Sequence, residues 1–412
     1  MTGQSLMHLA FFEALADETD DGSATWRETS AGLLVLRLFD GWIRALRRGE
    51  PGPEPSRVAA VRREVLEVED GSTMRPVLLG LVDVIRAGGR DAEGARGHLL
   101  AYARRLQFDA SWRLAADVYR TFVESRASGD VSAEGQGAAF QAGYCYRMAG
   151  DLDEAAVAYD VGEAIATAAH DVDGMLRARV CKVKLTTHRG NLPRAEAELD
   201  AIIRTAEEAG SRPALSLALT DRMAVAGQRG RYEEAATFGW RALQCCDDDL
   251  ERERILGDIA TALGDAGHRG AAYDAHTVLS ITARDRSVGW LATVNLLEMA
   301  VADGLELDFE RHRRAVADVP LPAAVRAKYH LTVGDGFRRF GRPGPAAAAY
   351  RQAIVVAEEH QVNEILLRAE AALRELEAVA PAPAERDTGS GVTIADVISA
   401  MRRLREEAGA GV

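Results

Sequence analysis

Hydrophobic residues recur along most of this chain at intervals of three and four positions, the spacing that places them on one face of an α-helix. The pattern predicts helices over residues 4–18, 26–48, 57–69 and 73–87. In 26–48 the leucines and aromatic residues stand nearly all round, so this helix is expected to be buried. A final helix is predicted from Val362 to Val379.

Between these ends a glycine returns at the end of one helical stretch after another. The six glycines are 40, 40, 37, 37 and 37 residues apart: Gly150, Gly190, Gly230, Gly267, Gly304 and Gly341. A small residue follows five positions later in most copies: Ala155, Ala195, Ala235, Ala272 and Ala346. Such self-similarity at a fixed period indicates one supersecondary unit used repeatedly.

The clearest copy runs from residue 139 to 159. In a pair of facing helices Gly143 leaves room for the partner helix, and Tyr146 and Tyr159 fill the seam. Gly150 allows the left-handed backbone of the turn, and Asp151 can cap the second helix. A copy near the C-terminus repeats the scheme with Gly334, Phe337, Gly341, Pro343, Ala346, Tyr350 and Ala353.

These residues resemble the tetratricopeptide repeat family, whose unit is a helix-turn-helix of 34 residues. The match is best at 131–164 and 326–360, whereas Gly239, His276 and Phe309 depart from the pattern. The longer period is similar to the extended tetratricopeptide-like repeats of bacterial regulatory proteins. The resemblance implies an all-α fold, a right-handed α-solenoid of helical hairpins.

Ala110 lies 40 residues before Gly150, so the array is expected to begin by residue 91. The predicted organisation is a divergent helical N-terminal cap at 1–90 and a repeat array with a capping helix at 91–379. Residues 380–392 are rich in proline, glycine and serine and are interpreted as a flexible linker.

Residues 393–412 are predicted to form an amphipathic helix. Its apolar residues fall on one face: Ile394, Val397, Ile398, Met401 and Leu404. Four interpretations stay open, namely docking on a partner, a homodimer through this helix, folding back on the solenoid, and a partly ordered tail.

Composition narrows the function classes. The formal net charge of −13 disfavours nucleic-acid binding, and no apolar run reaches the roughly 18 residues of a membrane helix. The N-terminus lacks a signal-peptide pattern, and the four cysteines lack a paired spacing, so a cytoplasmic protein with reduced thiols is expected. The excess of arginine over lysine, with abundant alanine and glycine, indicates a GC-rich bacterial coding sequence.

Motifs for catalysis and cofactors are nearly absent. The chain has no phosphate-binding loop, dinucleotide fingerprint, zinc-protease motif or nucleophile elbow. Asp387–Gly391 resembles the active-site loop of aspartic proteases, but it lies in the linker and lacks a second aspartate in a β-framework. His170, Asp171 and Asp173 come closest to metal spacing, yet they lie at a turn between repeats. We expect no enzyme, no cofactor and no metal.

The family resemblance also predicts an inner groove, lined by the first helix of each hairpin at unit positions 2, 5, 9, 12 and 13. With Ala110 and the six glycines at position 15, three groove positions are acidic: Asp265, Glu298 and Asp335. Eight are basic: Arg104, Arg147, Arg177, Lys184, Arg254, Lys328, Arg338 and Arg339. The groove is therefore expected to be positive although the chain as a whole is negative.

Arginine binds carboxylates in a bidentate manner, so the predicted ligand is a protein or peptide segment, with acidic segments favoured, held by a non-enzymatic scaffold or adaptor. Phe140 and Tyr144 could add apolar contacts, and Asn295 a contact to peptide backbone; the alternative for these aromatics is a place in the core. Two further functions stay open. One is a peptide- or ligand-responsive bacterial regulator acting through a partner protein, and the other is an enzyme with an unrecognised site such as Lys184, His188 and Asp265.

Overall fold

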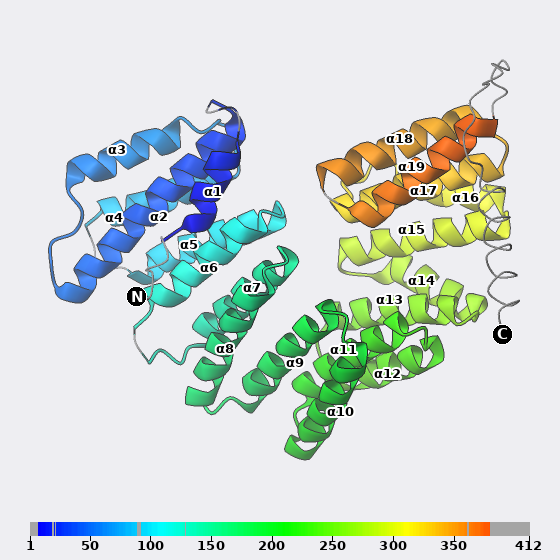
Figure 1. Ribbon diagram of the computed structural model, residues 1–412, viewed down its shortest axis with the longest axis horizontal. Coiled ribbons are helices and arrows are strands. Elements are labelled where there is room, and N and C mark those ends of the chain that lie inside the picture. The colour runs from blue at the N-terminus through cyan, green and yellow to red at the C-terminus, as the bar shows by residue number, and fades with distance from the viewer. Residues whose placement is uncertain are drawn as a thin grey trace, which may run out of the picture. The chain divides into compact units, whose positions relative to one another are not determined.

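A computed structural model describes residues 7–18, 20, 22–88, 92–127, 129–360 and 362–379. Over these residues the chain forms nineteen α-helices and no strand. The chain divides into two compact units, residues 1–285 and 286–412 (Figure 1). The predicted linker and C-terminal helix, 380–412, lie outside the described residues.

The first unit opens with four helices that precede the repeats. They are α1 (Leu9–Asp17), α2 (Ala24–Arg48), α3 (Pro55–Leu66) and α4 (Met74–Arg86). As predicted, α2 is the buried one: Leu36, Phe39 and Trp42 are at most 2 % exposed. Their side chains belong to one core that continues into the next three helices of the chain.

Five helical hairpins follow in the first unit. They are α5 (Ala92–Phe108) with α6 (Trp112–Ser125), α7 (Ala133–Met148) with α8 (Leu152–Ala168), α9 (Val172–His188) with α10 (Leu192–Ala209), α11 (Arg212–Gln228) with α12 (Tyr232–Cys245), and α13 (Asp249–Asp265) with α14 (Arg269–Thr282). In Figure 1 they follow one another in chain order from cyan to yellow-green.

The second unit continues the same design. It consists of α15 (Arg286–Asp303), α16 (Glu306–Ala315), α17 (Ala323–Arg339), α18 (Pro343–Glu359) and α19 (Asn363–Val379). As expected, Pro343 is the first residue of its helix, where the missing amide costs nothing. None of the described helices combines the length and apolar character needed to span a membrane.

Packing within each unit is that of a helical solenoid. Each helix contacts the helices next to it in the chain. The first helices of successive hairpins are also in contact: α7 contacts α9, and α9 contacts α11. In the second unit α15 touches α17, and α17 touches α19. The prediction of an all-α, tetratricopeptide-like solenoid is therefore confirmed.

The turns are built as the glycine spacing predicted. Gly150 has a φ of 83°, in the left-handed region that glycine enters without strain. Ala110, the earlier copy without a glycine, also takes a positive φ, 57°. One detail was wrong: Asp151 stands at the N-cap of α8 but makes no capping hydrogen bond. Its carboxylate instead accepts two hydrogen bonds of 2.7 Å from Arg113 of the preceding hairpin.

A buried histidine fastens α1 to the rest of the first unit. His8 is 1 % exposed, and its ring nitrogens lie 3.2 Å from Asp117 of α6 and 3.0 Å from Asp40 of α2. Burial by itself would lower the pKa of His8. The hydrogen bonds to Asp117 and Asp40 outweigh this and raise the pKa from 6.5 to about 9. The ring is therefore a buried imidazolium at neutral pH.

Because of these two contacts, the free energy of unfolding should fall as the pH becomes alkaline. Because the folded pKa is raised, the contribution of His8 is complete below about 6.5 and is lost as the pH rises through about 9. We expect the urea midpoint to fall between pH 7 and pH 9.5 by more in the wild type than in His8→Gln, whose amide does not titrate. Equal falls in both proteins would contradict the assignment.

Candidate functional site

One polar cavity of the described repeats is formed by the first three hairpins of the array. It has a volume of about 760 Å³, within the usual range of ligand sites. We call it the α5–α7–α9 cavity. Its lining comes from α5 (Leu100, Arg104, Gln107, Phe108), α6 (Trp112, Tyr119), α7 (Ala133, Glu134, Gly137, Ala138, Gln141, Tyr144) and α9 (Arg177).

The repeat register predicts much of this lining. Leu100, Arg104, Gln107 and Phe108 are positions 5, 9, 12 and 13 of their unit. Gly137 and Arg177 are both position 2 of theirs, and Tyr144 is position 9. Helices stacked with a constant rotation carry equivalent positions to one side, so residues far apart in the sequence meet on one wall.

Two arginines give the cavity its charge. Arg104 and Arg177 are exposed, and within the described residues neither forms an ion pair. The guanidinium of Arg177 lies 5.0 Å from the ring centre of Phe140, which holds it in place without neutralising it. Glu134 is the one acid of the lining, and it is 3.4 Å from Arg126. The cavity therefore offers two cations to a ligand.

A relay of hydrogen bonds crosses the cavity floor. The hydroxyl of Tyr119 donates to Gln107 Oε1 at 2.7 Å, and Gln107 Nε2 donates to Gln141 Oε1 at 3.2 Å. Burial raises the pKa of Tyr119 to about 12, while the nearby charge of Arg104 opposes the rise. The phenol therefore keeps its proton at neutral pH and donates it to Gln107 Oε1. Within the described residues the Gln141 amide nitrogen has no acceptor, so it is left as a donor for a backbone carbonyl.

Aromatic rings form the apolar part of the wall. Phe108 is 79 % exposed at the end of α5, and the guanidinium of Arg105 lies 4.8 Å from its ring centre. Trp112 and Tyr144 meet edge to face, with ring centres 5.9 Å apart. These rings can pack against apolar side chains of a bound segment.

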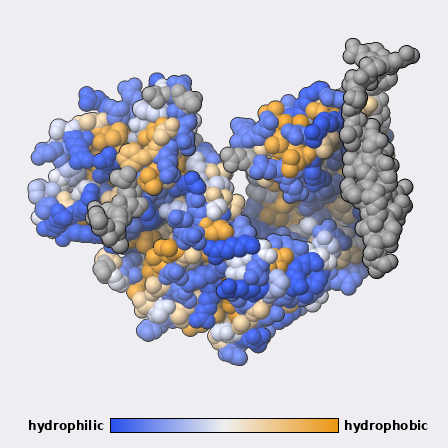
Figure 2. Space-filling model, viewed as in Figure 1, coloured by the Kyte–Doolittle hydropathy of each residue, from blue (hydrophilic) through white to orange (hydrophobic). Residues whose placement is uncertain are grey.

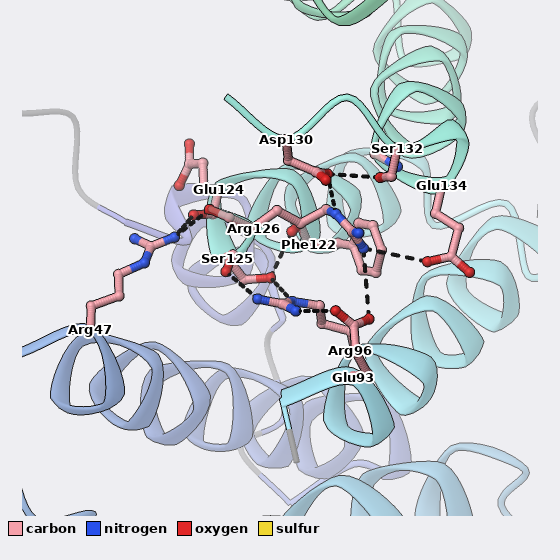
Figure 3. A network of polar contacts seen from close by, with 11 residues as sticks. Arg47, Glu93, Arg96, Phe122, Glu124, Ser125, Arg126, Asp130, Ser132 and Glu134 are labelled. Atoms are coloured by element: carbon pink, nitrogen blue, oxygen red, sulfur yellow. Dashed lines mark hydrogen bonds and ion pairs between the residues drawn. The ribbon is translucent and has the colours of Figure 1, made fainter. Parts of the chain in front are cut away.

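Polar contacts at the ends of α5, α6 and α7 hold this wall in position (Figure 3). Arg126, just after α6, bonds to Asp130 and pairs with Glu93 of α5 and Glu134 of α7. Arg96 of α5 donates to the carbonyl of Ser125 at 2.7 Å. Arg47 of α2 donates hydrogen bonds to two carbonyls at the end of α6, those of Glu124 and Arg126. These donors satisfy carbonyls that a helix end leaves unpaired.

Three of the predicted groove residues line the cavity: Arg104, Tyr144 and Arg177. Phe140 is only 4 % exposed and belongs to the core, so it supports Arg177 from below and does not face a ligand. Arg147 lies over the Tyr144 ring at 5.2 Å and is 2.7 Å from His188. It is the third predicted cation of this region that has no carboxylate partner within the described residues.

Two other predicted cations of the first unit are neutralised. Lys184 lies 3.2 Å from Asp221 of the next hairpin. Burial raises the pKa of Asp221, and the charge of Lys184 opposes the rise. Arg254 pairs with Glu251 at 3.4 Å and with Asp285 at 3.1 Å.

The predicted site residues of the second unit form their own contacts. Lys328 donates to Asn295 at 2.8 Å and pairs with Glu298 at 2.9 Å, so the Asn295 oxygen is occupied. Arg338 pairs with Glu375 at 3.0 Å. Arg339 is exposed, and in the described part of the chain it has no ion-pair partner.

The acids that come closest to metal spacing serve helix ends. Asp171 accepts from the Gly174 amide at 3.0 Å as the N-cap of α9, and Asp173 accepts from the Ser211 hydroxyl. Across the described residues no cluster of three or more His, Cys, Asp or Glu could hold a metal ion. The loop Asp387–Gly391 lies outside the described residues.

The cysteines could act as nucleophiles only as thiolates. All four cysteines are free, and burial raises the pKa of Cys145 to about 12, which disfavours the reactive thiolate. In the alternative enzyme site of Lys184, His188 and Asp265, two residues already have other partners. His188 contacts Arg147, and Lys184 contacts Asp221.

Comparisons with known proteins were made by sequence and by structure. No protein-family model matches the chain, and no curated protein matches its sequence. Solved structures with similar folds include the apo form of RapI, at 12 % identity and a TM-score of 0.45, covering 65 % of this chain and 98 % of that one. The apo quorum sensor NprR from B. thuringiensis gives 12 % and 0.45, covering 78 % and 97 %.

A tetratricopeptide repeat protein from Parabacteroides merdae gives 14 % identity and a TM-score of 0.43, covering 67 % of this chain and 98 % of that chain. At such identities a likeness concerns the fold alone. This chain is tetratricopeptide-like because of features of its own structure. These are its helical hairpins, its turns at fixed spacing, and the packing of Tyr159 and Tyr350 on glycines of the partner helix.

Proposed function

We propose that the protein binds an extended acidic peptide segment of another protein in the α5–α7–α9 cavity and acts as a cytoplasmic adaptor without chemistry of its own. The observation that carries the proposal is the pair of exposed arginines without ion-pair partners among the described residues, Arg104 and Arg177, on the first helices of hairpins two repeats apart. Four other predicted groove cations, Lys184, Arg254, Lys328 and Arg338, are occupied by carboxylates of the chain itself, so added negative charge gains less there.

The rest of the wall suits a peptide. The Gln141 amide is left to bind a backbone carbonyl, and Phe108, Trp112 and Tyr144 supply apolar surface beside the cations. A ligand with carboxylate side chains next to an aromatic or aliphatic residue would match both features. The free thiols agree with a reducing compartment.

Charge reversal tests the proposal. A library of short fluorescent peptides, randomised over Asp, Glu, Phe, Tyr, Lys and Arg, is screened on the full chain, and the best binder is titrated by anisotropy. We expect acidic sequences to be selected, and Arg104→Glu and Arg177→Glu each to weaken binding by about tenfold, or about 1.4 kcal/mol. Added salt should weaken wild-type binding and reduce the difference.

Arg204→Glu is the matched control, because Arg204 of α10 is exposed and outside the cavity. It makes the same change in net charge and should leave the affinity unchanged. Selection of basic peptides, or equal losses in the control and the cavity variants, would refute the proposed site.

A further inference from the structure

A second concave surface lies on the opposite face of α7. Tyr146, Ala142 and Ala139 of α7 form its floor, and α6 and α8 form its walls. Cavity residues such as Gln141 and Tyr144 stand about half a turn round the same helix, so the two surfaces are separate. We call this second surface, of about 330 Å³, the α6–α8 groove.

The groove exposes aliphatic side chains to water. Val157 is 63 % exposed and Val161 38 %, and they stand one turn apart on α8. Val123 of α6 and Ala158 complete the apolar lining. Figure 2 shows hydrophobic surface over the region of α6 to α8. Apolar surface gathered in a concave site and bordered by polar residues marks an interaction site more often than single exposed residues do.

The border of the groove is acidic. Glu124, Asp153 and Glu154 line it, against one cation, Arg120. Asp153 is paired with Arg189 at 2.8 Å and Glu124 lies 3.9 Å from Arg120, so Glu154 is the acid of the border without an ion-pair partner in the described part of the chain. Arg120 is already bound to the buried carboxylate of Asp117 at 2.6 Å, so little of its charge is left for the groove.

Other charged groups surround Glu124. Burial raises the pKa of this carboxyl. The charges of Arg120 and His8 oppose the rise, and the carboxylates of Asp40 and Asp117 add to it. An incoming cation would relieve this repulsion, whereas an incoming anion would increase it.

We propose that the α6–α8 groove docks an amphipathic helix of a partner protein, with aliphatic side chains at i and i+4 packed on Val157 and Val161 and Lys or Arg residues facing Glu124 and Glu154. Two ridges of helix with a trough between them match the shape of a third helix, and the charge of the border selects a basic one. The groove does not depend on the α5–α7–α9 cavity, so the protein could hold a peptide and a partner at once.

Two amidated helical peptides of about 18 residues, long enough to form helix, are the probes. They share one leucine and alanine pattern and differ in their flanks, which are lysine in one and glutamate in the other. On the full chain with labelled valine methyls, we expect the lysine peptide to shift the signals of Val157 and Val161 and to bind about tenfold more tightly than the glutamate peptide.

Val157→Arg should weaken the lysine peptide about tenfold, whereas Val278→Arg, at a valine 50 % exposed on α14, should not. Because both side chains already face water, neither change is expected to unfold the chain. Glu124→Lys combined with Glu154→Lys should reverse the preference toward the glutamate peptide.

Equal binding of both peptides, no binding, or methyl shifts confined to other valines would overturn the proposal. A homodimer abolished by Val157→Arg would overturn it too, because the occupant would then be a second copy of this chain.

Discussion

Arg222→Ala is expected to lower the free energy of unfolding of the central repeats by about 3 kcal/mol, the scale of breaking a buried ion pair from one side. Arg222 of α11 is 3 % exposed and binds Glu196 and Asp200 of α10 and Glu234 of α12. Its guanidinium also lies 4.5 Å from the ring centre of Phe238. Removing it leaves Asp200 without this cation and leaves Glu196 and Glu234 to the more exposed Arg229 and Arg231.

The effect should depend on acid pH in a defined direction. Burial opposes ionisation of Glu196, but the hydrogen bond from Arg231 and the charges of Arg222, Arg231 and Arg229 outweigh it and lower the pKa below its ordinary value of 4.5. Because the folded pKa is lowered, this stabilisation is present above about pH 4.5 and is lost as the pH falls through the folded pKa. The difference in free energy of unfolding between the wild type and Arg222→Ala should therefore become smaller at acid pH.

Hydrogen exchange across α10–α12 measures the change locally, since a repeat array need not unfold in one step. Arg222→Met keeps most of the packing and removes the charge, so it should lose most of the same stability if charge is the cause. The exposed Arg204→Ala on α10 should change little. A loss in Arg222→Met no larger than in Arg204→Ala would show that the carboxylates do not need the buried cation.

Much of the fold could be predicted because its signals are local. The apolar period of each helix, the left-handed turn at Gly150 and the equivalent turn at Ala110 each involve a few consecutive residues. Contacts between hairpins were not predicted, since His8 reaches Asp117 and Arg222 reaches Glu196 through the tertiary structure. The helical period contains no information about which charged partner a side chain will find.

The candidate site shows the same division. The register placed Arg104, Tyr144 and Arg177 on one wall, but it could not show that Gln141, one position from a groove position, completes a relay from Tyr119. The sequence does contain a signal that Arg338 is paired with a carboxylate. Arg338 and Glu375 are 37 residues apart, one repeat, so opposite charges at equivalent positions of successive units predict an ion pair.

Gly143→Ala is expected to destabilise the second hairpin of the array by about 2 kcal/mol, although alanine is the better helix former by about 1 kcal/mol. A Cβ at Gly143 would lie 2.5 Å from Cδ1 and 2.8 Å from Cζ of Tyr159, a ring that is 1 % exposed and cannot move away. The overlap must shift α7 from α8, and the cost of overpacking exceeds the gain in propensity. A Cβ at Gly334 would likewise lie 2.5 Å from the Tyr350 ring, so Gly334→Ala should be destabilising in the same way.

Gly137 supplies the control within the same helix, because a Cβ there would meet nothing within 4 Å. Gly137→Ala should therefore stabilise α7 by up to about 1 kcal/mol, and urea denaturation should place the two variants on opposite sides of the wild type. Replacing Tyr159 by leucine makes the cause testable. If the ring is the obstacle, Gly143→Ala should cost little in the Tyr159→Leu background, and the double-mutant cycle should give a coupling of about 2 kcal/mol. Stabilisation by Gly143→Ala in the wild-type background would mean that the hairpins are not held at the distance that this glycine–tyrosine contact sets.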